Sequence, residues 1–449
     1  MGATETQLAK FVREYPAAGI PEDVTHLAKR CVMNYCGVAL FGSLDPSVEI
    51  LLDWFRSDGA KPVATVLGKG FRTSPQNAAL ANGYIGHFED YDDTHTTVIH
   101  PTSPIFPAPL ALTEQQATSG RDLLAAFTIG VEVACRVGLL ISEHFRDGAE
   151  AWHITNTCGV LGAAAAAGRL LGLTEEQMIW NFAVAGTQAS GVREVFGSMC
   201  KPFHAGRAAQ NGLASATLVK HGFTGTDNIF TGNRGFAGVM ARDYDLGELT
   251  EGLGDHWELP NVGLKPYSCG AANHAFLDAA IALRTKEGVR PDTIQHVEGK
   301  VPRFAPNLIR HRHPLTALDT KFSYYHGLAI GLVDGQALPA QFTDDKAKDP
   351  VIHSVRDKVE VAEDPSLGRG AIVTLTLTDG RMYTERVEHA TGGPKNPMSD
   401  SQVEGKFKGL AAEVLSANQV DKATDMLWNL EKVSDARELI ELLVPSQKS

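Results

Sequence analysis

Apolar residues recur at every third or fourth position through most of this chain. The spacing is clear in residues 6–55, 105–145 and 154–190, and it is the period of an α-helix with one buried face. Residues 159–168 are almost all Gly and Ala, so neighbouring helices can approach this segment closely. The pattern predicts the interior of a helical bundle.

Local signals predict where several further elements begin. Ser74 before Pro75 is typical of an N-cap followed by the first helical position, and it predicts a helix over residues 76–87. Thr174 and Gln177 have the spacing of a capping box. We also expect a short extended run over residues 64–68 and a helix over residues 201–220.

The pattern changes after residue 260. Residues 262–268 and 293–301 predict strands that flank a helix over residues 271–286. Alternation from Val373 to Leu377, the turn residues Asp379 and Gly380, and the run 382–387 predict a hairpin. Helical spacing returns up to residue 443. We therefore predict a mostly α protein: a large all-helical domain formed by both chain ends, residues 1–260 and 396–449, with a smaller α+β domain inserted at residues 261–395.

Composition narrows the class of protein. A chain of 449 residues can form two or three domains, and its net charge of −12 argues against a nucleic-acid surface. No run of 18 apolar residues lacks a charge, so we expect no membrane span. The six cysteines are scattered, without the spacing of a zinc site, and residues 1–14 lack the apolar core of a secretion signal. We expect an intracellular protein, with the cytoplasm as the first expectation and an organelle as the alternative.

Residues 86–104 concentrate polar chemistry between two helical segments. They contain three histidines, four acids and several hydroxyl groups. Three interpretations are open at this point: a solvated loop that caps helices, an active-site loop for acid–base chemistry, or a metal site formed by Asp90, Asp93 and His95.

Three further polar clusters lie in apolar surroundings, and each has a structural alternative. His153 precedes the Ala-rich helix, where it either caps the helix or helps to bind an anion. Lys201 and His204 share one helix face, which suits carboxylate binding but also a solvated helix start. His274 follows a predicted strand at a helix N-terminus, where it is either a neutral base or an inert surface group.

Several common functional motifs are absent from the sequence. It lacks Gly-x-Gly-x-x-Gly, Gly-x-x-x-x-Gly-Lys-Ser/Thr, His-Glu-x-x-His and Gly-x-Ser-x-Gly. Dinucleotide-binding, nucleotide-binding, zinc-protease and serine-hydrolase functions therefore have no support from motifs.

Taken together, the polar clusters are similar to those of the MmgE/PrpD family, which includes 2-methylcitrate dehydratase, cis-aconitate decarboxylase and iminodisuccinate epimerase. The resemblance rests on an ordered set of motifs that spans nearly the whole chain. They are Asp90-Tyr-Asp-Asp-Thr94 with His100-Pro, Trp152-His153-x-Thr-x-Thr-x-Gly, Ser198-Met-x-Lys201-x-x-His204-Ala-Gly, Lys265-x-Tyr267 with His274, and Lys321-Phe-Ser.

The resemblance implies a helical domain with an inserted lid, a homodimer, and an active site between the domains that needs no metal and no organic cofactor. The positions that match the family's active site are Asp90, Asp93, Thr94, His100, His153, Lys201 and His274. For substrate binding we expect Lys201, His204, Lys265 and Tyr267.

Roles for these residues follow from charge and proton transfer. Lys201 and His204 would grip substrate carboxylates, while His100, His153 and His274 would divide carboxylate binding and proton transfer. Asp90 or Asp93 would orient a histidine and hold its tautomer. We expect His87 and His95 to be structural.

The resulting functional prediction is a cofactor-independent lyase that acts on a small di- or tricarboxylate by dehydration or decarboxylation. An epimerase of a small dicarboxylate is the alternative in the same pocket. A metal-dependent hydrolase and a non-catalytic binding protein are the alternatives from other classes. Segments 95–99 and 324–326 differ from what we expect of the family, so we expect them to influence substrate choice.

Overall fold

The computed structural model describes residues 2–97, 99–142, 152–302 and 311–446. Helices predominate, and the strands form only small sheets, the largest with four strands. The prediction of a mostly α protein is therefore confirmed. Contacts divide the chain into two compact units: unit 1 comprises residues 1–88, 92–262 and 399–449, and unit 2 comprises residues 89–91 and 263–398. Each unit is described by itself below.

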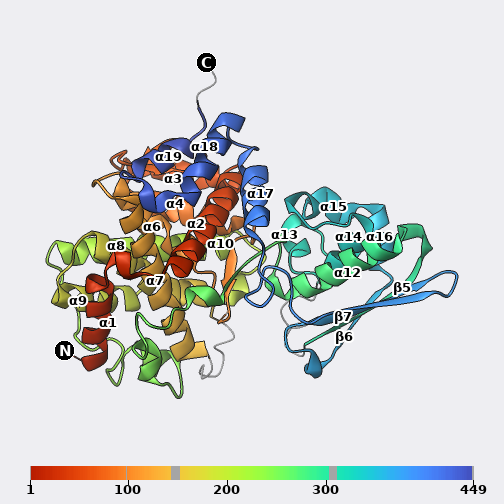
Figure 1. Ribbon diagram of the computed structural model, residues 1–449, viewed down its shortest axis with the longest axis horizontal. Helices are drawn as coiled ribbons and strands as arrows, with labels where there is room; N and C mark the ends of the chain where they lie inside the picture. Colours follow the sequence, from red (N-terminus) through yellow and green to blue (C-terminus); the bar gives the residue numbers. More distant parts are fainter. Residues whose placement is uncertain (1, 98, 143–151, 303–310, 447–449) are drawn as a thin grey trace. The chain divides into compact units, whose positions relative to one another are not determined.

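Unit 1 is a bundle of helices to which both chain ends contribute (Figure 1). Its two short strands β1 (Ala64–Val66) and β2 (Phe71–Thr73) pair as an antiparallel hairpin, and β3 (Asp93–His95) follows. Its helices are α1 (Ala3–Glu14), α2 (Glu22–Gly42), α3 (Ser47–Asp58), α4 (Pro75–Phe88), α5 (Thr102–Ile105), α6 (Pro107–Thr113), α7 (Gly120–Ser142), α8 (Ile154–Leu170), α9 (Glu175–Gly186), α10 (Cys200–Lys220), α11 (Phe236–Met240), α17 (Asp400–Ala411), α18 (Ala417–Trp428) and α19 (Arg437–Leu442).

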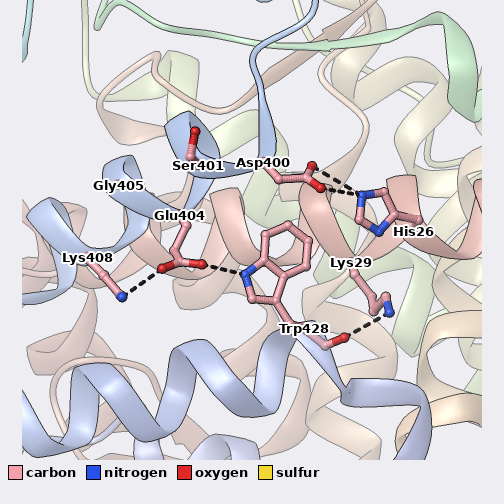
Figure 2. Close-up of a pocket in the computed structure, with 8 residues that line it drawn as sticks. All are labelled: His26, Lys29, Asp400, Ser401, Glu404, Gly405, Lys408 and Trp428. Carbon is pink, nitrogen blue, oxygen red and sulfur yellow. Dashed lines mark hydrogen bonds and ion pairs between the residues drawn. The ribbon is translucent and has the colours of Figure 1, made fainter.

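The C-terminal helices pack directly on the N-terminal ones. Helix α17 lies against α2, where a Cβ on Gly37 would come within 3.0 Å of the Phe407 Cα. Side chains of α2, α17 and α18 line a polar surface pocket of about 520 Å³ (Figure 2). In it the His26 ring stacks on Trp428, whose indole N–H donates to Glu404 over 2.9 Å. These contacts join the first and last segments of the chain into one unit.

Predicted helix starts in unit 1 are confirmed, and each of the two long predicted helical segments contains a break. Ser74 accepts from the Asn77 amide, and Thr174 forms a capping box with Gln177. The predicted helix over residues 105–145 breaks at residues 114–119, and its last three positions lie outside the described residues. In the predicted helical segment over residues 154–190, α8 ends at Leu170, Gly172 adopts a positive φ of 60°, and α9 starts at the predicted capping box.

Helix α7 is the one helix in the described part of the chain with the length and hydropathy of a membrane span. Of its most apolar window, 94% is buried inside the protein. It also carries Glu132 and Arg136, which form an ion pair of 2.6 Å one turn apart. A buried core helix meets the same length and hydropathy criteria.

Unit 2 is an α+β unit built on a four-stranded sheet in the order β6-β5-β7-β8. Strand β5 pairs parallel with β6 and antiparallel with β7, and the predicted hairpin β7–β8 is confirmed. Helices α12 and α14 pack on this sheet (Figure 1). The elements are β4 (Val262–Leu264), α12 (His274–Glu287), β5 (Ile294–Val301), α13 (Ala317–Thr320), α14 (Tyr324–Val333), α15 (Asp344–Lys348), α16 (Pro350–Arg356), β6 (Val359–Glu363), β7 (Ala371–Leu377) and β8 (Met382–Val387).

The predicted strand over residues 262–268 is too long. Strand β4 ends at Leu264, because Pro266 has no amide hydrogen to donate to a neighbouring strand. The next segment instead turns its side chains into polar contacts of unit 2, described below. The predicted helix over residues 271–286 begins as a 3-10 turn, and its α-helical part starts at His274.

Candidate active site

Three helix ends in unit 1 bring polar side chains together. His87 lies in the last turn of α4, His153 is the N-cap of α8, and Lys201 and His204 lie in the first turn of α10. Helix α10 packs on both α4 and α8. A Cβ on Gly206 of α10 would lie 2.3 Å from the Leu80 carbonyl oxygen of α4, so only glycine permits this helix spacing.

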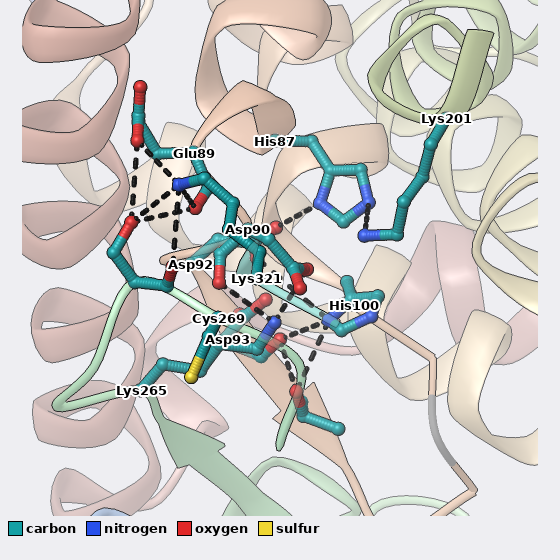
Figure 3. Close-up of polar contacts among 12 residues, drawn as sticks. His87, Glu89, Asp90, Asp92, Asp93, His100, Lys201, Lys265, Cys269 and Lys321 are labelled. Carbon is teal, nitrogen blue, oxygen red and sulfur yellow. Dashed lines mark hydrogen bonds and ion pairs between the residues drawn. The ribbon is translucent and has the colours of Figure 1, made fainter. Parts of the chain in front are cut away.

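His87 connects a carboxylate to a lysine. Its Nδ1 lies 2.8 Å from Asp92 Oδ2, and its Nε2 lies 3.2 Å from Lys201 Nζ (Figure 3). All three side chains are buried. His87, which we expect to be structural, therefore contacts a residue predicted to bind substrate.

The carboxylate against this histidine is one to which the sequence analysis gave no role. Asp92 Oδ2 lies against His87, and the other oxygen of Asp92 lies 3.8 Å from His100 Nδ1. Asp93 instead accepts from the Thr102 backbone amide over 3.3 Å and from the Thr102 hydroxyl group. These two adjacent aspartates therefore face different partners.

Four imidazole rings form one cluster, which we call the histidine cluster. The ring centroids of His87 and His100 are 4.8 Å apart, and those of His87 and His153 are 5.6 Å apart. His153 Nδ1 lies 2.9 Å from His204 Nδ1, so the two rings share one hydrogen. Nε2 of His153 is buried and has no hydrogen-bond partner among the described residues.

The electrostatics of the histidine cluster favour neutral rings. Burial, followed by the Lys201 cation and the other imidazoles, holds the pKa of His153 well below its usual value. Burial, His87 and Lys201 lower the pKa of His204 to about 4. In the free protein at neutral pH, Lys201 thus lies beside two uncharged imidazoles.

The loop after Asp92 holds two further predicted residues at the cluster. Thr94 Oγ1 lies 3.2 Å from His100 Nδ1. The His100 backbone amide donates to Thr155 Oγ1 over 3.1 Å, which attaches the loop to the first turn of α8. The structure therefore brings Asp93, Thr94 and His100 into the same part of unit 1 as His153 and Lys201.

Phe196 is an apolar side chain of the site that the sequence analysis missed. Its ring meets His153 edge-on with centroids 4.8 Å apart, and Lys201 Nζ lies 5.4 Å from its centroid. The loop that carries it is held by a bond of 2.8 Å from the His153 amide to the Gly191 carbonyl. One phenylalanine in a loop has no sequence signal that sets it apart from a core residue.

The remaining predicted residues belong to unit 2. Lys265 Nζ forms a buried ion pair of 2.7 Å with Asp90 Oδ1, and Lys321 Nζ lies 2.7 Å from Glu89 Oε2 (Figure 3). Asp90 is the one non-glycine residue with positive φ, 51°, in the described chain. Such strained backbone is often found at functional sites.

Tyr267 and His274 are the other predicted site residues in unit 2. The Tyr267 hydroxyl donates to Asp278 over 2.6 Å, and burial together with Asp278 raises the pKa of Tyr267. The His274 ring meets the Tyr267 ring edge-on at 5.4 Å, and its Nε2 lies 3.3 Å from the Cys269 carbonyl. His274 is the first residue of α12.

The donor atoms do not favour a metal ion in unit 1. Ring nitrogens of His87, His100 and His153 lie within 4.8 Å of one another, but both nitrogens of His87 already contact charged partners. The ammonium of Lys201, 3.2 Å from one of them, would repel a cation. His95, proposed as a ligand in the metal alternative, has one nitrogen 2.8 Å from Thr97 Oγ1 and the other 3.0 Å from Glu258 Oε2.

A buried group of imidazoles, an ammonium and carboxylates in a mostly helical unit is the kind of site that suits acid–base chemistry. The chain matches the MmgE/PrpD N-terminal domain over residues 6–249 and the MmgE/PrpD C-terminal domain over residues 267–432. It belongs to the MmgE/PrpD family, as the motifs predict.

Relatives of this chain include decarboxylases and dehydratases. The chain is 27% identical to cis-aconitate decarboxylase of Mus musculus, over 94% of this chain and 90% of that protein. It is 28% identical to cis-aconitate decarboxylase of Aspergillus terreus, over 94% of this chain and 92% of that protein. It is 24% identical to mitochondrial 2-methylcitrate dehydratase of Yarrowia lipolytica, over 71% of this chain and 66% of that protein. Both activities are lyase reactions, so the predicted enzyme class is confirmed.

Proposed function

We propose that this protein is a cofactor-independent lyase that releases carbon dioxide from a small tricarboxylate, with cis-aconitate as the first candidate. The observation that carries the proposal is the buried His153 Nε2, which has no partner among the described residues and lies in a cluster with Lys201. The similarity to cis-aconitate decarboxylases over 94% of this chain supports the choice of substrate.

The cluster suits a substrate with several carboxylates. A lysine ammonium and imidazole N–H groups are donors, and a carboxylate offers acceptors that charged donors hold strongly. A bound polyanion would also offset the repulsion that lowers the pKa values of His153 and His204. We therefore assign carboxylate binding to Lys201 and His204.

The proposed reaction consumes one proton for each carbon dioxide released. The bond between carbon and the departing carboxylate breaks, and its electron pair moves toward the double bond and a remaining carboxylate. A proton then adds to carbon, so the product carries one negative charge less than the substrate. His153 and His100 are our candidates for the proton donor, because both rings pack against His87, the histidine that contacts Lys201.

The part of the predicted residues of unit 2 in substrate binding stays a prediction. We assign substrate contacts to Lys265, Tyr267 and His274 on the basis of the family motifs. The homodimer and the intracellular location also stay predictions. Dehydration of a citrate-like substrate is the second candidate, and the similarity to 2-methylcitrate dehydratase favours it.

A substrate panel tests the proposal. The purified protein is incubated with cis-aconitate, citrate, 2-methylcitrate and iminodisuccinate, and the products are identified by mass spectrometry. We expect loss of the mass of carbon dioxide from cis-aconitate. Loss of water from a citrate would favour the dehydratase, inversion of iminodisuccinate without loss of mass would favour the epimerase, and no turnover of any compound would contradict a lyase for these substrates.

A further inference from the structure

Three buried side chains from separate segments form a continuous chain of hydrogen bonds in unit 1. Asp92 follows α4, His87 lies in its last turn, and Lys201 lies in the first turn of α10. Asp92 Oδ2 and His87 Nδ1 are 2.8 Å apart, and His87 Nε2 and Lys201 Nζ are 3.2 Å apart. We call these residues the Asp92–His87–Lys201 chain (Figure 3).

The chemistry of Lys201 and Asp92 assigns the tautomer of His87. A lysine ammonium can only donate, so His87 Nε2 must be the acceptor. The ring hydrogen then lies on Nδ1, where it donates to the Asp92 carboxylate. The Ser103 hydroxyl also donates to Asp92 Oδ2 over 2.8 Å, which holds the carboxylate in place.

Imidazoles and an aromatic ring of unit 1 also lie around Lys201. His153 and His204 interact with Lys201 electrostatically, and Arg193 lies 5.4 Å from the centroid of the Phe196 ring that Lys201 also faces. His100 lies beside His87. The Asp92 carboxylate reaches Lys201 through His87 and places a negative charge at the other end of the hydrogen-bonded chain.

We propose that Asp92 and His87 are positioning residues that keep Lys201 protonated and aim its ammonium at the substrate. This inference rests on the proposed function, because the ammonium is assigned there to a substrate carboxylate. Unlike an isolated structural histidine, His87 would then control the alkaline limit of activity, since Lys201 loses its proton more easily without an acceptor and a nearby anion.

Two substitutions at His87 test the two contacts of the Asp92–His87–Lys201 chain separately. In His87→Gln the side-chain amide reaches the position of Nε2 and keeps an acceptor for Lys201. In His87→Asn the shorter side-chain amide reaches only the position of Nδ1 and keeps the contact with Asp92. Asp92→Asn removes the anion and offers an N–H to His87, which favours the wrong tautomer. Thr128→Val is the control, because it removes a buried hydroxyl that bonds only within α7.

The readout is the pH at which Lys201 becomes reactive, measured by acetylation with acetic anhydride and mass spectrometry. For His87→Asn and Asp92→Asn, we expect this transition and the alkaline limb of kcat/KM to move down by about one pH unit. In His87→Gln and Thr128→Val, the acetylation transition and the alkaline limb of kcat/KM should both stay near their wild-type pH. If Asp92→Asn fails to fold, the comparison of His87→Gln with His87→Asn still tests the proposal.

Two results would overturn the proposal: equal transitions in His87→Gln and His87→Asn, or a wild-type transition in Asp92→Asn. The acetylation measurement needs no substrate. A failure of the proposed function, seen as absent turnover by the wild-type protein, is therefore distinguishable from a failure of the Asp92–His87–Lys201 chain.

Discussion

At the scale of single residues, the site depends on bases that are kept uncharged next to one ammonium. His153 and His204 share a hydrogen over 2.9 Å, and Lys201 adds positive charge beside them. A negatively charged substrate changes this balance by attracting protons and donors. In the proposed function, the charge of the cluster as a whole therefore matters more than any single group.

Removing Lys201 or His153 should abolish most of the turnover. We expect Lys201→Ala and His153→Ala each to lower kcat/KM by about 10²-fold or more, because each removes a charged donor or a proton-transfer group. Steady-state kinetics on cis-aconitate measures this, with circular dichroism to verify the fold. Full activity in both variants would refute the site assignment.

The lowered pKa of His204 predicts how stability depends on pH. The unfolded chain takes up a proton near pH 6.5, but the folded protein resists it down to about pH 4. The free energy of unfolding should therefore fall as the pH drops through this range, by at most about 1.4 kcal/mol per pH unit for each such histidine. Urea denaturation at several pH values should show a smaller slope for His204→Asn than for the wild type; an unchanged slope would contradict the lowered pKa.

At the scale of elements, close packing of α4, α8 and α10 sets the positions of the catalytic candidates. Gly206 faces the backbone of α4, and Gly212 faces α8, where a Cβ would lie 2.5 Å from the Ala163 Cβ. Small residues along α10 thus determine where Lys201 and His204 lie relative to His87 and His153.

Enlarging Gly206 should disturb both stability and the site. A Cβ there lies 2.3 Å from the Leu80 carbonyl oxygen, which is backbone and cannot move aside, so Gly206→Ala should cost about 1–3 kcal/mol. Gly409→Ala is the matched control: it is also helical, with nothing within 4 Å of its Cβ, and should stabilise by up to about 1 kcal/mol. Thermal unfolding and kcat are measured for both variants. Unchanged stability and kcat in Gly206→Ala would contradict the packing argument.

Periodicity predicted the elements better than it predicted their interruptions. Helical spacing and caps located the helices, and the alternation at residues 373–377 located the hairpin. Spacing could not separate His87 from an ordinary helix-end histidine, because its partner Lys201 lies 114 positions away in the chain. It also could not decide between Asp92 and Asp93, since that depends on which way each side chain points in the folded loop.

At the scale of the whole molecule, the chain is a two-unit member of the MmgE/PrpD family. Both chain ends build the helical unit, and most of residues 263–398 build the α+β unit. Unit 1 alone contains Lys201 and the histidine cluster, whereas the Asp90–Lys265 ion pair belongs to unit 2. The family motifs thus carry site candidates in both units.

The most direct test of the proposed function is proton NMR of cis-aconitate with the purified protein in deuterated water. We predict loss of carbon dioxide with one deuterium incorporated at carbon for each molecule converted, and no conversion by Lys201→Ala. Unchanged cis-aconitate, together with deuterium exchange and inversion in a dicarboxylate such as iminodisuccinate, would contradict a lyase and favour an epimerase.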